Sequence, residues 1–210
     1  MRFPLALLAC LVLPVAAFAQ ALTPPPVAAR AWYLLDTLSG QALAAQSEED
    51  RFEPASLTKL MTAYLVFSAI RDRKLDPAKT VPVSERAWKT GGSRMFVDPK
   101  KPAAVADLLR GMIVQSGNDA TIALAEAVAG TEEAFAQLMN REAKRLGLRN
   151  SSFVNATGLP APGHYATARD MAHLAAALIR DFPAEYALYS QKEFTWNGIT
   201  QANRNRLLWL

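Results

Sequence analysis

Apolar and polar residues follow two different periods along the chain, and together these periods predict a mixture of strands and helices. Short apolar runs bounded by Ser-Gly or Asn-Gly are typical of strands, whereas longer runs with apolar residues every three or four positions are typical of helices. Strands toward both ends with helices between them indicate an α/β sandwich that carries a helical insert. The expected strands are residues 30–37, 41–46, 80–83 and 194–196. The expected helices run from Ser56 to residue 71, and then over 105–114, 118–129, 132–146 and 167–181.

Two loops rich in glycine separate these elements. Residues 89–93 read Lys-Thr-Gly-Gly-Ser, and residues 150–165 form a longer loop that contains several glycines and prolines. The helix after the second loop begins at Thr167, and Asp170 three positions later completes the pattern of a capping box.

The helix that starts at Ser56 is apolar over most of its circumference, which predicts that it is buried. Its first turn breaks a local rule, because Lys59 occupies the position where a capping box has Glu or Gln. That lysine is expected near the positive end of the helix dipole and on the same face as Ser56. Burial and the dipole both lower the pKa of its amine, and a neutral amine beside a hydroxyl activates it as a nucleophile. A capping serine followed by a surface lysine is the alternative interpretation.

A second polar element, Ser116-x-Asn118, precedes the helix expected over residues 118–129. One interpretation is a plain capping box made by Ser116 and Asp119. The other is a functional element, in which the Ser116 hydroxyl and the Asn118 amide face Ser56 and Lys59.

The N-terminus has the pattern of a signal peptide. Arg2 precedes an apolar run over residues 4–18, and an Ala-Phe-Ala sequence at its end matches a small-x-small cleavage site. We therefore expect residues 1–19 to be a signal peptide, residues 20–29 an extended lead-in, and residues 30–210 one peptidase domain. The protein is then exported to the periplasm or cell envelope.

Composition narrows the function classes further. The single cysteine, Cys10, lies in the expected signal peptide, so the exported chain forms no disulfide and depends on its core. The net charge of +4 comes without clustered basic and aromatic residues, which argues against nucleic-acid binding. His164 and His173 lack a metal-ligand spacing to acids or cysteine, so we expect each on a loop or helix surface, and neither a metal nor another cofactor.

Three runs of sequence together resemble the low-molecular-mass penicillin-binding proteins, and within them the serine D-alanyl-D-alanine carboxypeptidases. The runs are Pro-Ala-Ser-Leu-Thr-Lys-Leu-Met-Thr-Ala-Tyr from Pro54, Gln-Ser-Gly-Asn-Asp-Ala from Gln115, and Gln-x-Asn-Arg-Asn-x-Leu-Leu-Trp from Gln201. The resemblance extends from about residue 31 to residue 209. It implies the penicillin-recognising serine transferase fold, an α+β arrangement in which an antiparallel sheet flanked by helices lies beside an all-helical subdomain.

The resemblance also implies a role for each residue of the two motifs. Ser56 is similar to the nucleophile that attacks the terminal D-Ala-D-Ala bond of a peptidoglycan stem pentapeptide and forms an acyl-enzyme. Lys59 resembles the general base, Ser116 the hydroxyl that relays a proton to the departing D-alanine, and Asn118 the amide that orients Lys59 and binds substrate. β-Lactam antibiotics are then expected as acylating inhibitors.

The third motif of that family, Lys-Thr-Gly on a strand, is expected after the Asn-Arg-Asn run, but the sequence reaches Leu210 first. We therefore expect the remaining strands, and any C-terminal membrane anchor, to lie beyond this sequence, and these residues alone to fold poorly and acylate slowly. The Lys-Thr-Gly at residues 89–91 precedes the Ser-x-Asn element and lacks flanking β-branched residues, so we do not assign it this role.

Other functions compatible with the same motifs are a β-lactamase, a murein DD-endopeptidase and a non-catalytic periplasmic penicillin-binding scaffold. A β-lactamase needs a deacylating carboxylate, and residues 151–162 contain no Asp or Glu. An endopeptidase would keep the same nucleophile and base, so the sequence leaves it open. The scaffold also stays open, because the third motif is missing.

Overall fold

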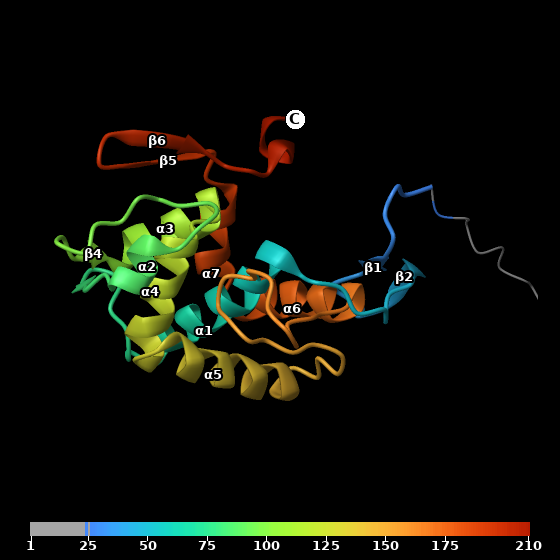
Figure 1. The fold of residues 1–210 in the computed structure, drawn as a ribbon. Coiled ribbons are helices and arrows are strands. Elements are labelled where there is room, and N and C mark those ends of the chain that lie inside the picture. The colour runs from blue at the N-terminus through green and yellow to red at the C-terminus, as the bar shows by residue number, and fades with distance from the viewer. Residues whose placement is uncertain (1–23, 25) are drawn as a thin grey trace, which may run out of the picture.

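The computed structural model describes residue 24 and residues 26–210, and Figure 1 shows the arrangement of its elements. The signal peptide expected at residues 1–19 lies outside the described residues. The helices are α1 (Lys59–Arg71), α2 (Glu85–Lys89), α3 (Val105–Gln115), α4 (Asn118–Ala129), α5 (Glu132–Arg145), α6 (Ala168–Asp181) and α7 (Pro183–Tyr186). The strands are β1 (Trp32–Leu35), β2 (Ala42–Gln46), β3 (Thr80–Val81), β4 (Ala103–Ala104), β5 (Glu193–Trp196) and β6 (Ile199–Ala202). Short 3-10 helices cover Ala55–Thr58, Ala187–Ser190 and Arg206–Trp209.

The longer helices confirm the sequence-based expectations, while the shorter elements were partly missed. Helix α2 was not expected, because five residues are too few to show a helical period; its N-cap Ser84 accepts a hydrogen bond from the Ala87 N–H. Thr167 caps α6 as expected. Asp170 does not complete the capping box, because its carboxylate accepts hydrogen bonds from Asn150 N and Ser151 Oγ instead.

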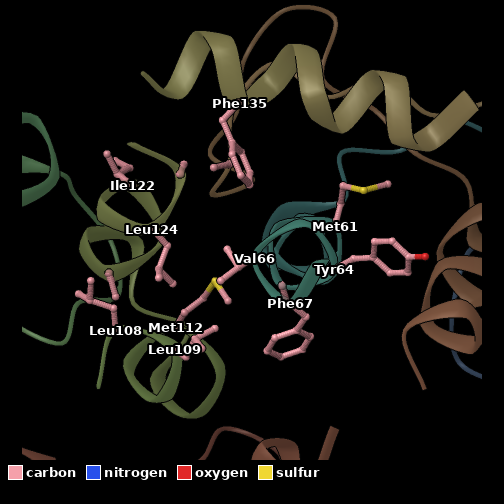
Figure 2. Close-up of a cluster of buried hydrophobic side chains, with 14 of the residues drawn as sticks. Met61, Tyr64, Val66, Phe67, Leu108, Leu109, Met112, Ile122, Leu124 and Phe135 are labelled. Carbon is pink, nitrogen blue, oxygen red and sulfur yellow. The ribbon is translucent and has the colours of Figure 1, made fainter. Parts of the chain in front are cut away.

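Helix α1 lies at the centre of the helical part of the molecule and contacts α3, α4, α5 and α6 (Figure 1). Its Met61, Val66 and Phe67 are fully buried. Figure 2 shows α1 from its end, with side chains leaving it toward helices on several sides. A helix that is apolar on all faces is stable only inside a core, so the position of α1 follows from its sequence. The start of this buried helix is therefore a rigid platform for the residues that it carries.

The strands form three separate antiparallel pairs, β1–β2, β3–β4 and β5–β6. The strands expected at residues 30–37, 41–46 and 194–196 are confirmed, and β6, which was not expected, pairs with β5 across the Asn197-Gly198 turn. Within the described residues the two end hairpins do not pair with each other. Among residues 24 and 26–210, no helix combines the length and hydropathy needed to cross a membrane.

Candidate active site

The turn that leads into α1 places Ser56 and Lys59 side by side. Pro54 begins a 3-10 turn over Ala55–Thr58, and α1 continues directly from Lys59. Ser56 is exposed, whereas Lys59 is only 6% exposed. The Lys59 amine lies 3.3 Å from the Ser56 hydroxyl oxygen. Ala55 has a positive φ of 46°, a strained conformation of the kind that clusters at functional sites.

Three oxygen atoms surround the Lys59 amine. Besides Ser56 Oγ, Nζ lies 2.8 Å from Asn118 Oδ1 and 2.8 Å from the carbonyl oxygen of Thr157. The Asn118 amide is oriented by its other end, because Nδ2 donates to the Gly91 carbonyl at 2.8 Å. Burial, together with the positive charge of Arg204, lowers the pKa of Lys59 from 10.5 to about 8.

This geometry suits a neutral amine. The two carbonyl-type oxygens, Asn118 Oδ1 and Thr157 O, can only accept hydrogen bonds, so they take two N–H groups of Lys59. A neutral amine has two N–H groups and one lone pair, and the remaining direction faces the Ser56 hydroxyl. Lys59 is therefore placed to accept the proton of Ser56 once it has lost its own charge.

Ser116 joins the site from the turn between α3 and α4. It ends α3 with a left-handed backbone, φ 60°, and its buried hydroxyl oxygen has no hydrogen-bond partner among the described residues. The capping-box interpretation of Ser116 and Asp119 is wrong: Gly117 is the N-cap of α4, and no side chain caps it. The Asp119 carboxylate instead accepts backbone N–H groups of residues 95–97.

A pocket of about 180 Å³ lies over these groups. Ser56, Lys59 and Ser116 line it together with Tyr189 and apolar side chains of α1 and α3. Three of the four residues expected at the site thus line one cavity. The fourth, Asn118, accepts a hydrogen bond from the Lys59 amine.

The Lys-Thr-Gly run at residues 89–91 lies at the end of α2 and not on a strand, as expected. Lys89 forms an exposed ion pair with Glu85, at 2.6 Å. The run touches the site only through its backbone, at the Gly91 carbonyl that orients Asn118.

Several residues of the site were not identified from the sequence. Thr157 contributes only its carbonyl, which any amino acid carries, so the sequence holds no signal for it. Gly158 has φ 84°, and a Cβ there would lie 1.7 Å from the Ala55 carbonyl oxygen. His164 lies on a loop, as expected, but it is buried beneath the site. Among the described residues, no three His, Cys, Asp or Glu side chains group as a metal site would need.

Solved structures with the same fold define the class of this chain. Penicillin-binding protein 5 from Haemophilus influenzae superposes with a TM-score of 0.87 at 46% identity, covering 89% of this chain and 55% of that chain. Penicillin-binding protein D2 from Listeria monocytogenes, in its ampicillin-bound form, superposes with a TM-score of 0.79 at 28% identity, covering 89% of this chain and 76% of that one. The chain has the fold of the penicillin-binding proteins.

The family follows from the sequence match. The family model of the D-alanyl-D-alanine carboxypeptidases, peptidase family S11, matches residues 18–210, and the chain belongs to this family. It is 51% identical to D-alanyl-D-alanine carboxypeptidase DacC of Escherichia coli K12, over 90% of this chain and 49% of that protein. The chain thus spans about half the length of the curated relatives that it matches.

Proposed function

We propose that this chain carries the acylation site of a serine-type DD-carboxypeptidase, which removes the terminal D-alanine from peptidoglycan stem pentapeptides. The observation that supports this most directly is the Lys59 amine, held by Asn118 Oδ1 and Thr157 O with Ser56 Oγ in its remaining direction. Family membership supplies the substrate class, a peptide that ends in D-Ala-D-Ala.

In the proposed reaction, Lys59 takes the proton from Ser56 as Oγ attacks the carbonyl carbon of the penultimate D-alanine. The backbone N–H of Ser56 is one donor to the oxyanion that develops, and such a donor acts mainly in the transition state. The C–N bond then breaks, and the proton passes from Lys59 through Ser116 to the nitrogen of the departing D-alanine. Ser116 suits this relay because its hydroxyl lines the pocket and is free of partners within the described part of the chain. Water then attacks the ester, and the proton returns to Ser56.

A β-lactam is proposed as an inhibitor by the same chemistry, since its strained amide presents a carbonyl carbon to Ser56. The ring nitrogen stays attached after the ring opens, so the leaving group does not diffuse away. The wider setting is also proposed: residues 1–19 direct export to the periplasm, and residues 30–210 belong to one peptidase domain. In that domain an antiparallel sheet flanked by helices would lie beside an all-helical subdomain.

Intact-protein mass spectrometry after long incubation with benzylpenicillin tests the proposed acylation. We expect one penicilloyl group on the chain, located at Ser56 by peptide mapping, and none on Ser56→Ala. Lys59→Met should slow adduct formation by at least about 100-fold, as loss of a general base does. Ser39→Ala and Lys89→Met are matched controls, since both remove exposed groups of residues that do not line the pocket.

Two outcomes would contradict the proposal. An adduct on a residue other than Ser56 would assign the nucleophile elsewhere. A chain that is folded by circular dichroism yet gains no adduct would favour the non-catalytic scaffold.

A further inference from the structure

A buried histidine connects the loop at residues 150–165 to the turn that carries Ser56 and Lys59. His164 is 4% exposed, and its Nε2 lies 2.8 Å from Oγ1 of Thr58, a fully buried residue between Ser56 and Lys59. Its other ring nitrogen, Nδ1, accepts the backbone N–H of Val154 at 3.0 Å. One imidazole ring therefore bridges the nucleophile turn and the start of the loop.

These contacts fix the tautomer of the ring. The Val154 N–H can only donate, so Nδ1 must carry a lone pair. The proton of a neutral ring then resides on Nε2, which donates to Thr58 Oγ1. A second proton on Nδ1 would place two donors against each other, in a ring that is only 4% exposed.

The same loop presents a ligand to the base. Thr157, three residues after Val154, gives its carbonyl to Lys59. Thr62 on α1 donates to the Ala156 carbonyl at 2.7 Å, so this part of the loop is bound to α1 directly. A displacement of Val154 would therefore also move the Thr157 carbonyl oxygen, which orients Lys59.

We propose that His164 is a positioning residue, which in its neutral form holds the Ser56–Lys59 turn and the Thr157 carbonyl in register and releases them when Nδ1 is protonated. The inference rests on the proposed function of Ser56 and Lys59. It adds a second protonation event, away from the base, that switches off acylation at acidic pH.

The charges around the ring set the direction of this effect. Burial lowers the pKa of His164 below its ordinary 6.5, and the negative charge of Glu53 opposes the shift. Other charged or titratable groups on neighbouring segments are Lys59, Glu132, whose carboxylate accepts the Ala156 N–H, and Tyr165. The neutral ring therefore stabilises the site above pH 6.5, and this contribution is lost as the pH falls below 6.5 toward the lowered pKa.

Nitrogen-detected NMR of the imidazole rings tests the geometry without requiring activity. The chain has only two histidines, so His173→Gln, on α6, assigns the spectrum and serves as the matched control. We expect His164 to be the Nε2–H tautomer with a pKa below 6.5, and the amide shifts of Thr58, Lys59 and Thr157 to follow its titration. The proposal would be overturned if His164 were the Nδ1–H tautomer or had a pKa at or above 6.5. It would also be overturned if the three amide shifts did not change as His164 titrates.

Acylation by a fluorescent penicillin, measured against pH, tests the consequence. In His164→Gln the amide has a donor and an acceptor on one carbon, like the two ring nitrogens, but does not titrate. We expect the wild-type rate to fall with a slope steeper than about one below pH 6.5, and the His164→Gln rate to keep a slope of about one from Lys59 alone.

Comparing His164→Ala with His164→Gln shows whether the hydrogen bonds of the side chain are needed to position the site. His164→Ala should lose about tenfold or more in acylation rate at pH 8, and His164→Gln should recover most of it. The proposal would be contradicted if the acylation rates of the wild type and His164→Gln fell with the same slope at acidic pH. Full activity in His164→Ala would contradict it as well. If no form acylates while the NMR titration behaves as expected, the proposed function fails and the positioning geometry stands.

Discussion

At the scale of single residues, Lys59 is held in conditions that oppose its own charge. Its amine is buried, and Arg204 adds a second positive charge nearby. Asn118 and Thr157 accept its N–H groups but carry no negative charge to balance the ammonium form. Relative to the unfolded chain, the folded state therefore favours the neutral amine, which is the form that the proposed mechanism requires.

The pH dependence of the unfolding free energy measures how far the fold lowers the pKa of Lys59. The pKa of Lys59 is lowered from 10.5 to about 8, so between these values the unfolded chain binds the proton and the folded chain does not. The free energy of unfolding of the wild type should rise by on the order of 3 kcal/mol relative to Lys59→Met across this range. Urea titrations between pH 7 and pH 10.5 measure the difference. Lys89→Met removes an exposed amine, so its unfolding free energy should change with pH as that of the wild type does. The same pH dependence in Lys59→Met would contradict the lowered pKa of Lys59.

Arg204 provides a second test of the same residue. Its positive charge contributes to the lowered pKa of Lys59, and its side chain hydrogen-bonds to Ser93 Oγ. Arg204→Gln should move the alkaline rise in acylation rate, centred at about pH 8, to higher pH. Acylation rates of both proteins with a fluorescent penicillin over pH 6 to 10 give the midpoints, and Arg110→Gln on α3 is the matched control. An unchanged or lower midpoint would contradict a contribution of the Arg204 charge to the lowered pKa of Lys59.

At the scale of elements, the site is a junction between the start of α1 and the loop at residues 150–165. The loop reaches α1 closely because Gly158 has no side chain and a positive φ of 84°. Asn155 folds it locally, since its Oδ1 accepts the N–H groups of Thr157 and Gly158. The position of the Thr157 carbonyl is therefore a property of the junction, not of either element alone.

Gly158→Ala tests this junction. The new Cβ would meet the Ala55 carbonyl oxygen at 1.7 Å, so the loop or the turn must move. We expect a loss of about 3 kcal/mol or more in unfolding free energy and a fall in acylation rate under conditions where the variant is still folded. Gly163→Ala has a similar φ of 82° but a nearest atom at 3.9 Å, so it should lose only about 1 kcal/mol. Equal losses in the two variants would show that backbone strain, not the close approach, dominates.

The elements also show which parts of the site the sequence could predict. Ser56 and Lys59 were predictable because a three-residue spacing places two side chains on one helical face. Ser116 was identified as a candidate, but its capping alternative failed only once Asp119 was seen to bind a distant loop. Thr157 and the buried position of His164 were not predictable, since both depend on how a loop about 100 residues away folds over α1.

At the scale of the whole molecule, the core and the hairpins differ in burial. Helices α1 and α4 carry many fully buried residues, whereas β2 has no buried residue and β1 is at most half-buried. Leu34, Leu38 and Leu43 on the β1–β2 hairpin are exposed. A two-stranded hairpin with so little buried surface adds little stability of its own.

Hydrogen exchange should follow this division. Amides of β1 and β2 should exchange through local opening that costs at most a few kcal/mol, while those of α1 and α4 exchange only with global unfolding. Exchange monitored by mass spectrometry on peptides from residues 30–46, 59–71 and 118–129 separates the two classes. Equal protection of the hairpin and the central helices would mean that the hairpin unfolds cooperatively with the core.

The backbone contact between Thr157 and Lys59 has a consequence for how the site tolerates genetic variation. A main-chain oxygen survives every missense change at its own codon, but the Thr157 side chain is 2% exposed and its hydroxyl bonds to Asn155 Oδ1 and the Leu159 N–H, so position 157 accepts only small side chains. Selection must act also on the neighbours that set the path of the chain, among them Asn155, Gly158 and His164. Saturation mutagenesis should therefore find that position 157 accepts small side chains and rejects bulky ones, whereas Gly158 accepts almost no substitution.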